Sequence, residues 1–238
     1  MERPRMIRPG IFSIDAATDR LRGVFDAHNE ALIAHQVPVD AVFFGDSITE
    51  MWALDVFFQG INGGLVNRGI GGDRTVFARR RFEADVLQLH PRLAVINIGV
   101  NNTWDLDLSW DPSQRREPEE IEDEIVDDLA AMVRRAREHG MAVALCSILP
   151  TDVPFKGTTA ARNALILRAN PRLQALAAEH GAVYVDYHAR LVADDGQTLR
   201  AGLADDGLHP HVQGYQIMAA ILLETLREAG LEAIARRG

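Results

Sequence analysis

Short apolar segments rich in β-forming residues alternate with longer segments of helical periodicity along almost the whole 238-residue chain. Five of the apolar segments are expected to form strands: residues 42–44, 65–67, 93–98, 142–148 and 182–185. They lack the alternation of apolar and polar residues that marks a strand with one face in water, so both faces of each strand are expected to be buried. Repeated strand-then-helix order predicts an α/β fold with a parallel sheet and helices on both of its faces.

Three segments between or after these strands have the pattern of amphipathic helices. Apolar side chains recur on one stripe of residues 121–133, with acidic residues before them and arginines after them, as the helix dipole favours. Residues 158–180 and 211–229 are expected to form the other two helices. Gly140 and Gly181 each precede a strand, where the C-cap of a helix is expected.

The length of the chain fits one domain over residues 1–238, with residues 1–37 as an N-terminal arm and helix on its core. Its single cysteine, Cys146, excludes an intramolecular disulfide. A net charge of −9 argues against a nucleic-acid partner, and no apolar run approaches the ~18 residues of a membrane span. The N-terminal residues lack the apolar stretch of a signal peptide, so we expect a cytoplasmic protein.

Open parallel sheets bind ligands beyond the carboxyl ends of their strands, so the residues after each expected strand are the candidates for chemistry. Gly45-Asp46-Ser47 follows the first strand and places Ser47 at the start of a helix, as an exposed hydroxyl or as a plain N-cap. The Gly-x-Ser-x-Gly elbow of α/β-hydrolases is absent. Residues 67–73 follow the second strand, and their three glycines could cradle a phosphate, supply an oxyanion-hole N–H or form a tight turn. They match neither nucleotide-binding motif.

Two more segments complete the set of candidates. Asn101 follows the third strand, where its amide can donate to a developing oxyanion or occupy a turn. Asp206 and His209 are three residues apart, close enough for the carboxylate to hold one imidazole nitrogen while the other acts as a general base. His209 and His211 do not complete a metal site, and we expect no metal or organic cofactor. Each role that a serine nucleophile requires therefore has one candidate.

These segments resemble the four sequence blocks of the SGNH (GDSL) hydrolase superfamily, over residues 41 to about 230. The resemblance implies a flavodoxin-like three-layer α/β/α sandwich with a central parallel sheet of about five strands. It implies a catalytic triad of Ser47, Asp206 and His209. It also implies an oxyanion hole formed by the backbone N–H groups of Ser47 and Gly72 and by the side chain of Asn101.

The loop 70–75 and the pair Asn101-Asn102 look closest to the catalytic subunits of platelet-activating-factor acetylhydrolases. Two departures border the expected site: Arg74 stands where threonine is usual, and the loop at residues 103–118 is longer and has no clear period. Such long segments are often binding loops or lids, although a packed surface excursion is an equal alternative. A homodimer is compatible with this resemblance.

Several further residues are candidates for the surroundings of the site. An acyl or sugar pocket could be lined by Trp104, Trp110, Met51, Trp52 and Phe155, although apolar residues are more often core. Asp46, Asp73 and Asn102 are candidate supporting residues, and the two acids either brace their loops or lie on the solvated surface.

We therefore expect a serine esterase that hydrolyses small carboxylic esters, with acetyl or other short acyl groups first, through an acyl-enzyme intermediate. A lysophospholipase, a thioesterase and a sugar deacetylase are alternatives that use the same triad. A non-catalytic α/β protein that binds an anion at the glycine-rich loop is the alternative from another class.

Overall fold

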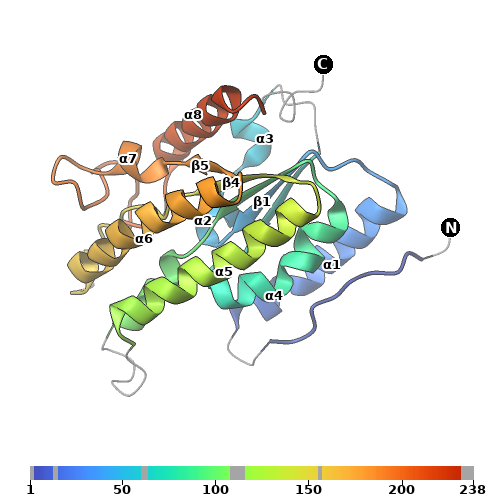
Figure 1. Ribbon diagram of the computed structural model, residues 1–238, viewed down its shortest axis with the longest axis horizontal. Coiled ribbons are helices and arrows are strands. Elements are labelled where there is room, and N and C mark those ends of the chain that lie inside the picture. Colours follow the sequence, from blue (N-terminus) through green and yellow to red (C-terminus); the bar gives the residue numbers. More distant parts are fainter. Residues whose placement is uncertain (1–2, 13–15, 60–63, 108–115, 155–156, 232–238) are drawn as a thin grey trace.

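The computed structural model describes residues 3–12, 16–59, 64–107, 116–154 and 157–231 of the chain. Within them, five parallel strands form one sheet in the order β2-β1-β3-β4-β5. Figure 1 shows this sheet packed against helices. The strands are β1 (Ala41–Gly45), β2 (Leu65–Gly69), β3 (Leu93–Asn97), β4 (Ala142–Cys146) and β5 (Val183–Val185). This order is that of flavodoxin-like sheets, and the expected five-stranded α/β fold is confirmed.

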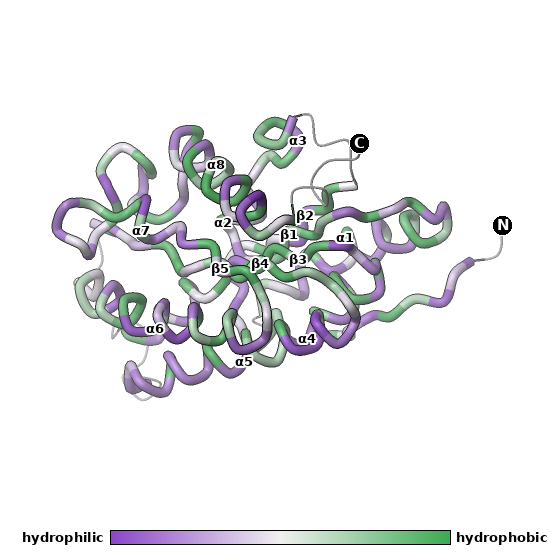
Figure 2. The backbone as a smooth tube through the Cα atoms, turned by 45° about the horizontal axis from the view of Figure 1, so that its top comes forward, coloured by the Kyte–Doolittle hydropathy of each residue, from purple (hydrophilic) through white to green (hydrophobic). Residues whose placement is uncertain are grey.

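Two layers of helices enclose the sheet. One face is covered by α4 (Thr75–Asp85), α5 (Pro118–Glu138) and α6 (Thr159–Glu179), with α1 (Ala17–Ala34) beside α4. The other carries α3 (Leu54–Phe57) and α8 (Val212–Glu228), and Figure 2 shows the strands between the two layers. Shorter helices are α2 (Ser47–Glu50), α7 (Tyr187–Leu191) and the 3-10 helices η1 (Leu87–Leu89) and η2 (Val100–Leu106).

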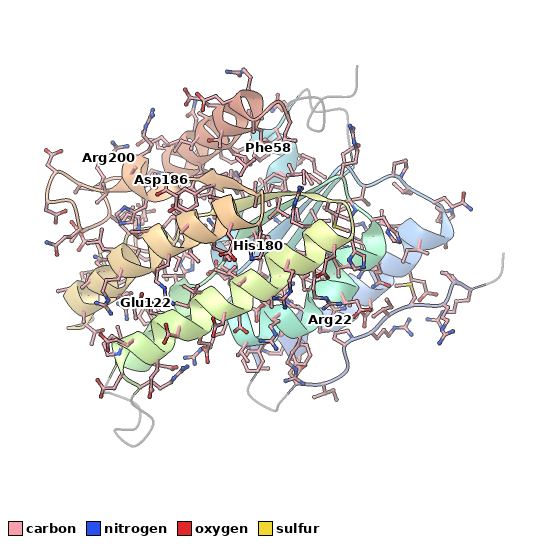
Figure 3. All side chains as sticks on the ribbon, viewed as in Figure 1. Arg22, Phe58, Glu122, His180, Asp186 and Arg200 are labelled. Atoms are coloured by element: carbon pink, nitrogen blue, oxygen red, sulfur yellow. The ribbon has the colours of Figure 1, made fainter. Side chains whose placement is uncertain are left out.

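Contacts between side chains tie neighbouring helices of the first layer together. Glu122 of α5, labelled in Figure 3, accepts hydrogen bonds from Arg168 at 3.0 Å and Arg172 at 2.8 Å, both on α6. Arg22 of α1 forms an ion pair with the buried Asp85 of α4. Through this pair the N-terminal helix is attached to the layer that covers the sheet.

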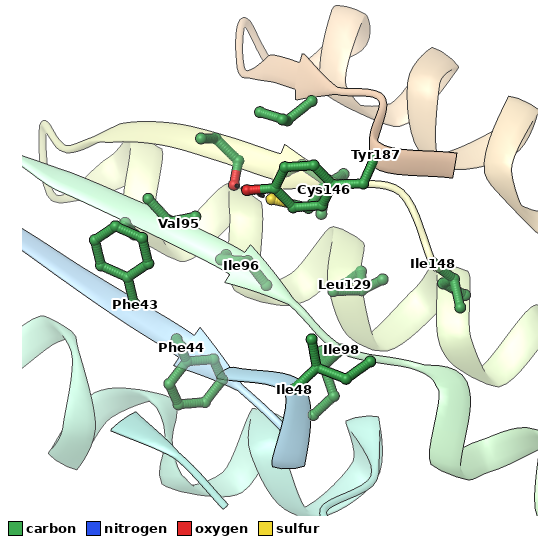
Figure 4. Packing of buried hydrophobic residues seen from close by; sticks show 14 of the residues in the cluster. Phe43, Phe44, Ile48, Val95, Ile96, Ile98, Leu129, Cys146, Ile148 and Tyr187 are labelled. Atoms are coloured by element: carbon green, nitrogen blue, oxygen red, sulfur yellow. Dashed lines mark hydrogen bonds between the residues drawn. The ribbon is translucent and has the colours of Figure 1, made fainter. Parts of the chain in front are cut away.

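The central strand shows why an uninterrupted apolar sequence is compatible with a strand here. Phe43 packs against Trp52 and Phe58 on one face, with ring centroids 5.7 and 5.1 Å apart. Its neighbour Phe44 packs edge-on against Phe82 of α4 on the other face, at 5.2 Å. Figure 4 shows Phe43 and Phe44 on β1 among the buried residues of the core. Successive side chains of a strand point to opposite faces, and both faces of this sheet are covered by helices.

The observed helices match the periodic segments and differ from the expectations where no period exists. The expected helices 158–180 and 211–229 are α6 and α8 to within one residue at each end. Residues 103–118 were expected to lack structure, but residues 103–106 belong to the 3-10 helix η2, so that expectation is wrong for its first part. A 3-10 helix is too short to produce a periodic signal in the sequence. Residues 108–115 lie outside the described part of the chain.

Candidate active site

The topology of the sheet brings the candidate segments to one edge. From β1 the chain passes to β2 on one side of the sheet and then crosses to β3 on the other side. The crevice of such a sheet lies at this switch point, beyond the carboxyl ends of the strands. Ser47 follows β1, the glycine-rich loop 70–74 follows β2, and Asn101 follows β3, so all three lie at this edge.

Ser47, His209 and Asp206 form one hydrogen-bonded chain. His209 Nε2 lies 2.8 Å from Ser47 Oγ, and His209 Nδ1 lies 2.6 Å from Asp206 Oδ2. Ser47 is the first residue of α2, whereas the other two belong to the turn that precedes α8. The structure therefore brings together the three side chains that the sequence suggested as candidate nucleophile, base and orienting carboxylate.

Hydrogen bonds within the turn set the geometry of Asp206. Its Oδ1 accepts the backbone N–H groups of Leu208 at 2.9 Å and His209 at 2.8 Å, which leaves Oδ2 for the imidazole. Burial disfavours the charged carboxylate, but the bonds to His209 and Leu208 outweigh it and lower the pKa of Asp206. An ionised Asp206 fixes the Nδ1–H tautomer and leaves the Nε2 lone pair directed at Ser47.

Gly207 allows this turn to lie against the neighbouring loop. Its φ is +76°, and a Cβ atom there would lie 1.8 Å from the carbonyl oxygen of Asp152. The Asp152 N–H donates to the Gly207 carbonyl at 2.8 Å. A side chain at this position would displace the Asp206–His209 turn, so the glycine contributes to the position of His209.

Asp46 caps the short helix that carries Ser47. Its Oδ1 accepts the backbone N–H of Ile48 at 3.0 Å, and the Tyr215 hydroxyl donates to the Ile48 carbonyl at 2.8 Å. Asp46 is almost completely buried, and burial raises its pKa to about 7. The alternative of a solvated surface residue is therefore wrong for Asp46.

The glycine-rich loop presents one backbone donor that has no partner. Gly71 N–H donates to the Glu50 carboxylate at 2.6 Å, whereas Gly72 N–H has no hydrogen-bond partner among the described residues. Gly72 adopts a φ of +77°, in the left-handed region that favours glycine. Its N–H group is thus available to a ligand at the same edge of the sheet as Ser47.

Arg81 of α4 ties the ends of two strands to this loop, and sequence reasoning missed it. Its fully buried side chain donates to the carboxylates of Asp73 at 2.8 Å and Asp85 at 2.9 Å. It also donates to the carbonyl oxygens of Gly45 and Arg68, at 2.9 Å each. Burial disfavours the charged guanidinium, but the two carboxylates outweigh it and raise the pKa of Arg81. Only the three-dimensional fold distinguishes Arg81 from its neighbours Arg79 and Arg80.

Asp73 is a buried junction, so the surface alternative is wrong for it too. Its Oδ1 accepts from the Thr18 hydroxyl at 2.7 Å and from the Arg74 N–H at 3.0 Å. Thr18 lies at the start of α1, and the N-terminal helix therefore supports the glycine-rich loop. The carbonyl oxygen of Asp73 accepts a hydrogen bond from Asn101 Nδ2 at 3.0 Å.

Asn101 and Asn102 fix η2 against the loop. The Asn101 Oδ1 atom accepts from Trp104 Nε1 at 2.9 Å, and one of its two amide hydrogens remains after the bond to Asp73. Asn102 is fully buried; its Oδ1 accepts the Thr75 N–H at 3.2 Å, and its Nδ2 lies 2.8 Å from Thr75 Oγ1 and from Glu124 Oε1. Asn102 therefore supports the site from within the protein.

The two departures from the resembled subgroup are in contact. Arg74 Nη2 lies 2.6 Å from Asp105 Oδ1, on η2. Arg116, near the other end of the long segment, lies 3.6 Å from Asp105 and 2.8 Å from Glu124. The arginine at position 74 and the segment 103–118 are thus parts of one arrangement beside the loop.

The residues suggested as the lining of a pocket differ in how exposed they are. Trp52 is 3% exposed and packs among Phe43, Phe58 and Tyr215, so it belongs to the core and its assignment to a pocket is wrong. Met51 is 57% exposed, and Trp104 is half-buried. Trp110 and Phe155 lie outside the described residues.

The described residues were expected to hold neither a metal site nor a membrane-spanning helix. No three histidine, cysteine or acidic side chains there come together as a metal site would require, and His211 caps α8 by accepting the Gln213 N–H at 3.2 Å. No helix in this part of the chain is long and apolar enough to cross a membrane.

Residues 43–217, more than half of the chain, match the GDSL-like Lipase/Acylhydrolase family. The acetylxylan esterase of Geobacillus stearothermophilus is 27% identical over 174 residues, 73% of this chain and 75% of that protein. The acetylxylan esterase of Xylanibacter ruminicola is 25% identical over 210 residues, 77% of this chain but only 42% of that longer protein. A solved GDSL-like lipase from Bacteroides thetaiotaomicron shares 28% identity with a TM-score of 0.69, and the match covers 85% of this chain and 98% of that one.

Proposed function

The chain belongs to the GDSL-like lipase/acylhydrolase family of carboxylic ester hydrolases, and we propose that it removes acetyl or other short acyl groups from small ester substrates. The observation that carries this proposal is the continuous chain of hydrogen bonds from Asp206 through His209 to Ser47. A phosphate cradle has no need of an oriented general base beside its serine. The chain of bonds therefore favours a hydrolase over a protein that only binds an anion.

The first half of the reaction forms an acyl-enzyme. His209 Nε2 takes the proton of Ser47 as its Oγ attacks the ester carbonyl carbon. The Ser47 and Gly72 N–H groups and the remaining amide hydrogen of Asn101 hold the resulting oxyanion. When the bond between the carbonyl carbon and the leaving oxygen breaks, His209 transfers its proton to that oxygen and an alcohol departs.

The second half frees the acyl group. His209 takes a proton from water, whose oxygen attacks the acyl carbonyl, and then returns that proton to Ser47 Oγ as the acid leaves. In both halves the carboxylate of Asp206 stabilises the charged imidazolium and keeps it in one orientation. No step requires a group other than water and the residues of this chain.

The comparisons favour an acetylated sugar as the substrate, with the sugar alcohol as the leaving group. Both relatives described above are acetylxylan esterases, and each is at least 25% identical to this chain. Sugar hydroxyls are alcohols, so an acetylated sugar requires the same attack, the same oxyanion and the same proton transfer as any other ester.

Hydrolysis of p-nitrophenyl esters from acetate to dodecanoate tests the proposal, with Ser47→Ala as the matched variant. We expect turnover on the shortest esters that Ser47→Ala reduces by roughly 10⁴-fold or more. Release of acetate from acetylated xylo-oligosaccharides tests the sugar alternative. Turnover that rises with chain length would replace the short-acyl proposal with a lysophospholipase or thioesterase. Equal turnover of the wild type and Ser47→Ala would contradict the triad.

A further inference from the structure

We propose that Trp104 is a positioning residue of the oxyanion hole, which orients and polarises the amide of Asn101. This inference rests on the proposed function, because it concerns the donor that Asn101 presents to the ester oxygen. The sequence suggested that Trp104 lines a pocket, but its indole N–H donates a hydrogen bond to that amide.

The Asn101 amide is bonded at both ends and can take only one orientation. Its Oδ1 accepts from Trp104 Nε1 at 2.9 Å, and its Nδ2 donates to the Asp73 carbonyl oxygen at 3.0 Å. Exchange of the amide oxygen and nitrogen would place two oxygens together at Asp73 and two N–H groups together at Trp104. Both contacts therefore oppose the flip, and the second hydrogen of Nδ2 is left for the substrate.

The 3-10 geometry of η2 is what brings the two side chains together. A 3-10 helix has three residues per turn, so the side chains of residues i and i+3 lie above one another. Asn101 and Trp104 stand in this relation within Val100–Leu106. The stretch that the sequence left without a period thus has a specific spacing that the bond requires.

Arg162 holds the indole from behind. Its guanidinium carbon lies 3.9 Å from the centroid of the Trp104 ring, and its side chain is fully buried. Its Nε donates to Thr103 Oγ1 at 2.9 Å, and its Nη2 lies 3.4 Å from Asp107. Because Arg162 belongs to α6, these contacts fix η2 and its tryptophan against the body of the protein.

The cation strengthens the chain of donors that ends at the substrate. A positive charge over the indole face draws electron density from the ring and makes its N–H a stronger donor. Donation to Asn101 Oδ1 polarises the amide, and polarisation along a chain of hydrogen bonds strengthens the next donor. The remaining Nδ2–H of Asn101 is the next donor, directed at the charge that develops on the ester oxygen.

Trp104→Phe removes the N–H and keeps most of the aromatic surface. We expect its kcat on p-nitrophenyl acetate to fall by about tenfold while KM stays within about twofold, because the bond acts on the transition state. Asn101→Ala alone should lower kcat by roughly 10²- to 10³-fold. In the Asn101→Ala background, Trp104→Phe should have no further effect, because Trp104 acts through Asn101.

Trp52→Phe is the matched control, since the buried Trp52 Nε1 has no hydrogen-bond partner among the described residues. The same substitution there should leave kcat within about twofold. The rate at which a fluorophosphonate labels Ser47 gives a second readout that needs no ester, and we expect the same pattern. Thermal unfolding of each variant verifies that it is folded.

The outcomes separate the inference from the proposed function. A loss at Trp104→Phe that persists in full in the Asn101→Ala background, or a loss that lies entirely in KM, would show a pocket or purely structural role. An unchanged kcat in folded Trp104→Phe would also overturn the inference. Absence of both turnover and labelling in the wild type would instead contradict the proposed function, and the inference with it.

Discussion

The two sides of the site are held in different ways. On one side, Asp206 and His209 are partly exposed, with side-chain exposures of 47% and 28%, and the hydrogen bonds of Asp206 reach residues two or three positions away. On the other, the glycine-rich loop and η2 rest on Asp73 and Arg81, which are both fully buried. Their bonds reach residues far away in the sequence, such as Thr18 from Asp73 and Gly45 from Arg81.

Because of this difference, we expect substitutions on the two sides to affect different quantities, the catalytic rate on one side and the unfolding free energy on the other. Because the side chains of Asp206 and His209 are partly exposed, we expect a change to either side chain to alter the chemistry and to leave the fold intact. A buried charge network supports the fold itself, because removal of one partner leaves an unpaired charge away from water. We therefore expect the triad side to be sensitive in rate and the oxyanion side to be sensitive in stability.

Among the substitutions that test this comparison, Asp206→Asn has the largest expected effect. The asparagine amide favours the wrong imidazole tautomer, so kcat should fall by roughly 10³- to 10⁴-fold. Ester turnover and thermal unfolding are measured on the same preparation, and Tm should change by less than about 3 °C. Asp205→Asn is the control, since it removes the same charge from the neighbouring exposed position, and its kcat should stay within twofold. A variant of Asp206 that loses stability instead of rate would reverse the comparison.

The contact between Asp206 and His209 could be predicted from the sequence because it is local. Three residues separate Asp206 from His209, and a carboxylate at that spacing in a turn reaches one ring nitrogen. The strands were also predictable, because an uninterrupted apolar segment indicates burial on both faces. Ser47 follows the first of these strands, so the carboxyl edge of the sheet was the place where the turn with His209 was expected to contact it.

The supports of the oxyanion side could not be predicted, because they depend on which face of an element is turned inward. Helix α4 has three successive arginines, and only the one at position 81 is turned into the protein. Likewise, the bond between Trp104 and Asn101 depends on a 3-10 helix that leaves no periodic signal. The sequence identified Asp46 and Asp73 as candidate supporting residues, but it did not predict that both are buried.

Arg81→Met is expected to have the second largest effect, and it acts on stability. It keeps much of the side-chain volume but leaves the buried Asp73 without its cation, whereas Asp85 keeps Arg22, and we expect a cost of about 3–5 kcal/mol in unfolding free energy. Denaturant unfolding measures this loss. Arg80→Met is the control on the same helix, since Arg80 is exposed and its contact with the Phe12 ring is worth about 0.5–1 kcal/mol. Equal losses in the two variants would remove Arg81 from the role given to it here.

The dependence of stability on pH distinguishes Asp46 from Asp206. Burial raises the pKa of Asp46 from 3.8 to about 7, so the folded state favours its protonated form. Its contribution to stability is complete below about pH 4 and is lost as the pH rises towards 7, by a few kcal/mol. The pKa of Asp206 is lowered, so its contribution is present above the ordinary carboxyl pKa and is lost as the pH falls.

Asp46→Asn isolates the first contribution. Asparagine stays neutral and can keep the bond to the Ile48 N–H, so the unfolding free energy of the variant should lack the part of the pH dependence that Asp46 supplies. Denaturant unfolding between pH 4 and 7.5 measures the difference between variant and wild type. The pKa values of His28 and of the buried His188 are lowered, chiefly by desolvation, and these two groups contribute alike to both proteins and cancel. Asp55→Asn, at an exposed position of α3, should follow the wild type, and a difference that is independent of pH would show that Asp46 stays ionised in the fold.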